Sequence, residues 1–60
     1  MRVTEKDVLA AATMRATYRG ENVAMVSATV LELIDSLNTA YKGEAYMAEL
    51  EKLYRQYATS

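Results

Sequence analysis

The chain contains no cysteine, no histidine and no proline. The lack of cysteine excludes disulfides, zinc–thiolate sites and thiol nucleophiles. The lack of histidine removes the usual general base and the commonest metal ligand. Carboxylates do not fill the gap, because Glu49 and Glu51 lie about 200° apart on a helix and cannot converge on one ion. We therefore expect no enzyme activity, no metal site and no cofactor.

Long hydrophobic runs are also missing. The longest uninterrupted apolar run spans four or five residues, against about 18 for a segment that crosses a bilayer. The amino terminus is charged from Arg2 onwards and has no apolar core of the kind that marks a secretory signal. We expect a cytoplasmic protein that does not enter a membrane. The net charge of −1 supplies no long-range attraction for nucleic acid.

Glycine is rare, and its two occurrences, Gly20 and Gly43, divide the 60 residues into thirds. The residues that mark strands and hairpins are therefore nearly absent. We predict one all-α domain over residues 1–60, a small three-helix unit. The three helices are expected over residues 5–18, 23–41 and 44–58.

The ends of these helices carry capping residues. Thr4 with Asp7 resembles a capping box, and Asn22 is a suitable N-cap for the second helix. Gly20 can adopt the left-handed conformation that closes the first helix. One alternative is a short strand over residues 23–26, because Val is common there and β-branching favours strands.

The three predicted helices differ in how well their apolar residues are confined to one side. In the first helix, Val8, Ala12 and Ala16 share one side, whereas Met14 and Tyr18 lie nearly opposite. The second helix is apolar almost all round in its first half, which predicts a central position with burial on several sides. The third helix is cleanly amphipathic, and its polar side carries Glu51 and Arg55 at the spacing of an ion pair.

The second and third helices carry more apolar surface than a chain of this length readily buries alone. We therefore expect a helical-bundle homodimer with twofold symmetry. The residues predicted at the dimer or partner interface are Val23, Val26, Val30, Ile34, Leu37, Tyr46, Leu50, Leu53, Tyr54 and Tyr57.

The aromatic residues are all tyrosine, five in number. Tyrosine combines a large contact area with a polar tip, which suits a surface covered by a partner. Because the chain lacks the usual catalytic and metal-binding residues, we expect it to be a small interaction protein that binds a larger protein. Such a regulator, inhibitor or adaptor is typical of phages and mobile elements.

The alternative function is a dimeric transcriptional regulator that binds nucleic acid. Its contacts would come from the local basic cluster of Arg15, Tyr18 and Arg19. A simpler interpretation of the same residues is that both arginines complement the negative end of the first helix while Tyr18 packs.

Overall fold

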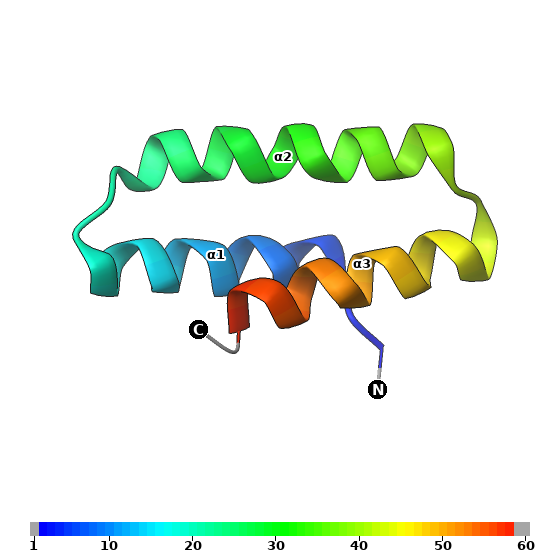
Figure 1. The fold of residues 1–60 in the computed structure, drawn as a ribbon, viewed down its shortest axis with the longest axis horizontal. Helices are drawn as coiled ribbons and strands as arrows, with labels where there is room; N and C mark the ends of the chain where they lie inside the picture. The colour runs from blue at the N-terminus through cyan, green and yellow to red at the C-terminus, as the bar shows by residue number, and fades with distance from the viewer. Residues whose placement is uncertain (1, 59–60) are drawn as a thin grey trace.

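The computed structural model describes residues 2–58 as three helices (Figure 1). They are α1 over Glu5–Arg19, α2 over Val23–Ala40 and α3 over Gly43–Ala58. The prediction of an all-α chain with three helices is confirmed, and each helix ends within one residue of its expected position. The alternative of a strand over residues 23–26 is wrong, because these residues form the first turn of α2. The cap before them outweighs their β-branched side chains.

The predicted caps are present. The Thr4 hydroxyl accepts the Asp7 backbone N–H at 3.2 Å, and the Asp7 carboxylate accepts the Thr4 N–H at 2.9 Å. The Asn22 side-chain oxygen accepts the Met25 N–H at 3.1 Å. Gly20 closes α1 with a φ of 68°, in the left-handed region. These residues therefore satisfy backbone groups that a helix end leaves unpaired.

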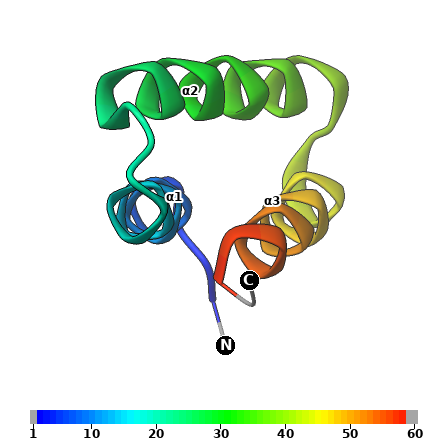
Figure 2. The ribbon, with the colours of Figure 1, turned by 60° about the vertical axis from the view of Figure 1, so that its left-hand side comes forward.

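Helix α2 lies across one side of a layer formed by α1 and α3 (Figures 1 and 2). In Figure 1 both α1 and α3 run in the direction opposite to α2, and Figure 2 shows that α2 crosses over them at an angle. Helix α1 packs extensively against both neighbours, whereas α2 and α3 touch over a shorter stretch. The prediction of a central second helix is therefore wrong. Helix α1 takes that place because its buried face contains the small residues Ala12 and Ala16, which let other helices approach closely.

The core is small and draws on all three helices. Val8 and Val30 are the largest side chains that are completely buried. The described core cluster is completed by Val3, Ala12, Ile34, Leu50 and Leu53. A core of this size leaves much of the apolar surface of the chain outside it.

The two ends of the described chain lie on the same side of the molecule. Both are found on the side of the α1–α3 layer that faces away from α2 (Figure 2). The outward side of α2 is therefore clear of both ends.

By length and composition alone, α2 is apolar enough to cross a membrane, the one such helix among the described residues. Core helices of soluble proteins often have the same length and composition. Glu32 and Asp35 interrupt the outward side of α2, and its Val30 and Ile34 side chains belong to the core. The compact fold with one weakly apolar helix is consistent with a soluble protein.

Candidate interaction surfaces

The residues predicted at an interface fall into three groups in the folded chain. Four are core residues, five pack against the core with part of their surface exposed, and one is 40% exposed. The stripes on α2 and α3 therefore meet each other and α1 within a single chain. The core residues are Val30, Ile34, Leu50 and Leu53. The partly exposed residues that pack against the core are Val26, Leu37, Tyr46, Tyr54 and Tyr57. The residue that is 40% exposed is Val23.

Most of the apolar surface of α2 points outward. Only Val30 and Ile34 of its 18 residues are buried, whereas Met25 is 67% and Leu31 54% exposed. Helix α2 also has no lysine or arginine, and its only charges are Glu32 and Asp35. We define the α2 face as the exposed apolar residues Ala24, Met25, Ala28 and Leu31 on the outward side of α2, where the exposed Glu32 and Asp35 lie among them.

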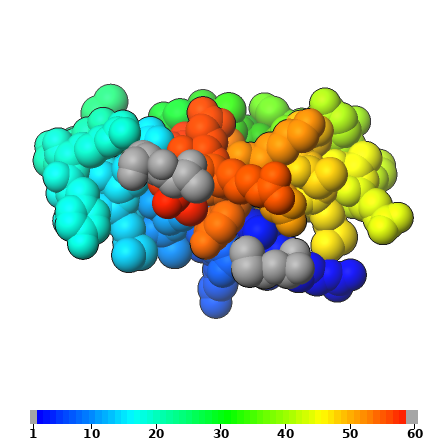
Figure 3. Space-filling model, turned by 60° about the horizontal axis from the view of Figure 1, so that its bottom comes forward, coloured from blue at the N-terminus to red at the C-terminus, as the bar shows by residue number. Residues whose placement is uncertain are grey.

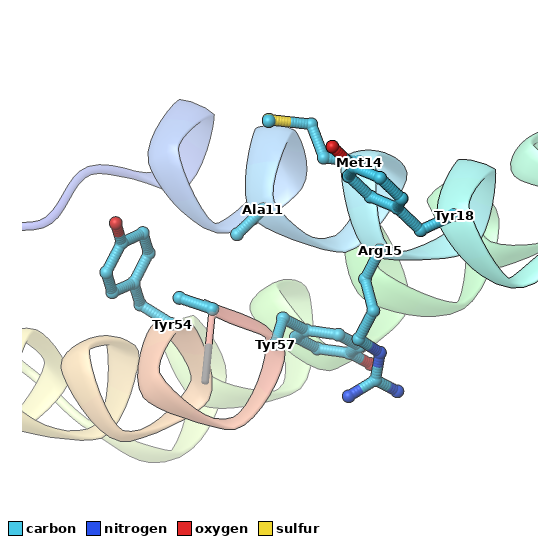
Figure 4. A pocket seen from close by; sticks show the side chains of 7 residues that line it. Ala11, Met14, Arg15, Tyr18, Tyr54 and Tyr57 are labelled. Atoms are coloured by element: carbon cyan, nitrogen blue, oxygen red, sulfur yellow. The ribbon is translucent and has the colours of Figure 1, made fainter. Parts of the chain in front are cut away.

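A second surface lies between α1 and α3, on the face that Figure 3 turns toward the viewer. It contains a hollow of about 310 Å³. Met14 and Tyr18 form its outer wall on α1, and Tyr54 and Tyr57 approach from α3 (Figure 4). We define this tyrosine groove by its lining residues, Ala11, Met14, Arg15, Tyr18, Tyr54, Tyr57 and Ala58.

Arg15 connects the two helices at one end of the tyrosine groove. Its guanidinium lies 4.7 Å from the centre of the Tyr57 ring (Figure 4), and its Nη1 donates to the Gln56 carbonyl at 3.1 Å. This carbonyl is in the last turn of α3, where a cation is favourable. Arg15 therefore stabilises the end of α3 as well as packing on an aromatic ring.

Tyr18 does not pack. It is 90% exposed, so the simpler interpretation of the basic cluster is wrong for this residue. The helical periodicity of α1 places Tyr18 on the side away from Ala12 and Ala16. No side chain of the described parts of α2 or α3 covers it. Arg19, in the last turn of α1, is also exposed. The structure thus brings Arg15 and Tyr18 to one groove, with Arg15 turned toward α3.

Another link between α1 and α3 was not foreseen from the sequence. The Tyr46 hydroxyl donates to the Glu5 carboxylate at 2.6 Å. Burial, this hydrogen bond and the negative charge of Glu5 together raise the pKa of Tyr46 to about 12. The two residues are 41 positions apart, and no local pattern pairs them.

Between α2 and α3 there is a smaller hollow of about 220 Å³, lined by residues that include Leu33, Glu49 and Lys52. Lys52 and Glu49 form an ion pair at 3.0 Å. The ion pair expected between Arg55 and Glu51 is confirmed at 2.7 Å. Within residues 2–58, no three acidic side chains come together in a way that would hold a metal ion.

Comparison with protein-family models, curated proteins and solved structures gives no match for this chain.

Proposed function

We propose that this protein is a non-catalytic interaction protein, a regulator, inhibitor or adaptor that binds a larger protein through the tyrosine groove. The observation that carries the proposal is the exposure of Tyr18, 90%, and Met14, 62%, beside a hollow. Large side chains of this kind are enriched at the centres of protein interfaces.

The groove has the properties of a binding surface that is formed before its partner arrives. Tyr54 and Tyr57 are partly buried against the core, and Arg15 holds Tyr57 from the opposite helix. A partner side chain that enters the hollow would meet apolar rings and an adjacent methionine, which adapts its shape to what it contacts. The tyrosine hydroxyls would remain at the wet edge of the contact. Because Tyr54 and Tyr57 already pack against the core, binding a partner orders these two rings little further, which favours affinity.

Nucleic-acid binding through Arg15, Tyr18 and Arg19 is the weaker proposal. The guanidinium of Arg15 is already engaged by Tyr57 and by the Gln56 carbonyl. The net charge of −1 adds no general attraction for phosphates.

Photocrosslinking tests the main proposal. We would replace Tyr18 with p-benzoylphenylalanine, express the protein in cells of its source organism, irradiate them and identify the captured protein. The matched control places the same group at Thr17, an exposed neighbour that points away from the groove. We expect one defined larger protein at position 18, displaced by excess unlabelled wild type and absent at position 17. Equal capture at both positions, or none at position 18, contradicts the proposal.

The salt dependence of DNA binding tests the nucleic-acid proposal. Binding to mixed-sequence DNA should fall steeply between low and physiological salt if phosphates are contacted, and it should be lost in the double variant Arg15→Ala, Arg19→Ala. We expect no binding even at low salt.

A further inference from the structure

We infer that the partner segment bound in the tyrosine groove carries an acidic side chain next to the apolar side chain that enters the hollow. The inference rests on the proposed function and adds the chemistry of the partner to it. Arg15 is the residue that receives the carboxylate of this acidic side chain.

The tyrosine groove carries a positive charge and no negative one. Arg15 is the only charged residue among those that line the hollow. On each helix, the acidic residue nearest to the groove in sequence already has a partner. The Asp7 carboxylate accepts the Thr4 N–H at 2.9 Å, and the Glu51 carboxylate pairs with Arg55 at 2.7 Å. No carboxylate of residues 2–58 therefore pairs with Arg15.

Arg15 is held in place with most of its hydrogen-bonding capacity unused. A guanidinium has five N–H donors in a fixed fork. The contact with the Tyr57 ring, 4.7 Å away, is a cation–π contact (Figure 4). Within the described part of the chain, the guanidinium makes one hydrogen bond, from Nη1 to the Gln56 carbonyl. The remaining donors can receive a carboxylate, whose two oxygens match the fork in a bidentate pair.

The end of α3 offsets only part of the charge of Arg15. The unpaired carbonyl groups in the last turn of a helix together carry about half an elementary negative charge. A carboxylate would add a full charge. Arg15 is partly buried, so this attraction would be screened less than at the exposed Arg19, which lies one turn further along α1 and outside the lining of the hollow.

The rest of the tyrosine groove suits an apolar side chain. The hollow of about 310 Å³ is at the lower end of the range of about 300 to 1,000 Å³ for small-molecule sites. It therefore fits a large side chain better than a cofactor. Met14, Tyr54 and Tyr57 offer it thioether and ring surface. A phosphate backbone, in contrast, is bound by several lysines and arginines together, and this hollow has one.

Three small probes separate the apolar and the acidic parts of this recognition. Hydrocinnamate combines a phenyl ring with a carboxylate, hydrocinnamamide has the same ring without the charge, and acetate has the carboxylate without the ring. Titration into isotope-labelled protein, followed by nitrogen–proton correlation NMR, measures their binding. Ligands of this size are expected to bind with a Kd of about 1 to 10 mM. We expect hydrocinnamate to shift the signals of Met14, Tyr18 and Tyr57, and to bind about tenfold more tightly than either other probe.

A matched pair of variants assigns the effect to Arg15. Arg15→Gln should weaken hydrocinnamate binding about tenfold, to the level of hydrocinnamamide. Arg19→Gln removes the same charge one turn further along α1 and should leave the binding unchanged. Circular dichroism checks the fold of Arg15→Gln, because Arg15 also links α1 to α3. The comparison of acid with amide on wild type does not depend on this variant.

The inference is overturned if acid and amide bind equally, if acetate binds as tightly as hydrocinnamate, or if no binding is detected up to about 20 mM. Signals shifted mainly outside the groove, or an equal loss in Arg19→Gln, would also overturn it. Photocrosslinking at Tyr18 tests the proposed function separately. Equal binding of acid and amide leaves a protein captured there unaffected. No captured protein, with the preference for the acid intact, contradicts the proposed function and not the chemistry of the groove.

Discussion

The hydroxyl of Tyr46 joins α3 to α1 through a single hydrogen bond to the Glu5 carboxylate, 2.6 Å long. It is the one side-chain to side-chain hydrogen bond among those described that links two different helices. Because its donor titrates with a pKa raised to about 12, the contribution of this residue to stability depends on pH.

We predict that the Tyr46 contribution is lost in alkaline solution. An unfolded tyrosine ionises near pH 10, whereas the folded Tyr46 holds its proton to about pH 12. Its stabilising effect should be complete below pH 10 and should decline as the pH rises through 12. Tyr46→Phe should therefore cost about 1 kcal/mol at pH 8 and progressively less above pH 10.

Urea unfolding of both proteins, followed by circular dichroism between pH 8 and 12, measures this difference. Tyr18→Phe is the control for loss of a tyrosine hydroxyl, because Tyr18 is 90% exposed and its substitution should change the free energy of unfolding by no more than about 0.5 kcal/mol. A difference in the free energy of unfolding between wild type and Tyr46→Phe that stays constant from pH 8 to 12 would contradict the prediction.

At the scale of single elements, the end of α1 depends on Gly20. Its φ of 68° is unfavourable for residues with a Cβ, yet a Cβ placed there would meet no atom within 4 Å. The cost of substitution is therefore conformational and not steric. We predict that Gly20→Ala destabilises the protein by about 1 kcal/mol.

Gly20→Asn should cost less, because asparagine tolerates the left-handed region better than alanine does. Thermal unfolding of the two variants beside wild type compares them. Equal losses for Ala and Asn would show that the left-handed conformation does not set the cost.

The number, order and ends of the helices were predictable because their signals are local. A capping side chain contacts backbone only three residues away, as Thr4 does with Asp7, so the sequence contains the whole interaction. The link from Arg15 to Gln56, like that from Tyr46 to Glu5, joins residues 41 positions apart. No periodic pattern identifies such a pair before the helix arrangement is known.

At the scale of the whole molecule, a stripe of apolar residues does not tell whether it forms the core of one chain or an interface with another. A stripe such as Val30, Ile34, Leu50 and Leu53 has the same spacing whether it meets its own chain or another one. In this fold it closes the core of a single chain. The remaining apolar residues, such as Leu31, are exposed, and the apolar first half of α2 does not by itself indicate which of its sides is buried. The small residues of α1, and not the breadth of the stripe on α2, decide which helix is central.

Because the core is small, we expect a substitution that leaves a cavity in it to destabilise the protein strongly. A chain of this size is stabilised by about 3 to 9 kcal/mol, and truncation of a buried leucine costs about 2 to 5 kcal/mol. Leu50 is only 2% exposed, so Leu50→Ala should lower the melting temperature by more than about 10 °C or unfold the chain.

The matched control is Leu31→Ala, the same substitution on the outward side of α2. At low protein concentration, where a dimer is dissociated, it should change the free energy of unfolding by no more than about 0.5 kcal/mol. Thermal unfolding monitored by circular dichroism measures both. A Leu50→Ala variant as stable as Leu31→Ala would show that the described core does not hold the fold together.

Both ends of the described chain lie on the side of the molecule away from α2 (Figure 2). A domain fused to either end would therefore extend from the α1–α3 side and leave the outward side of α2 uncovered.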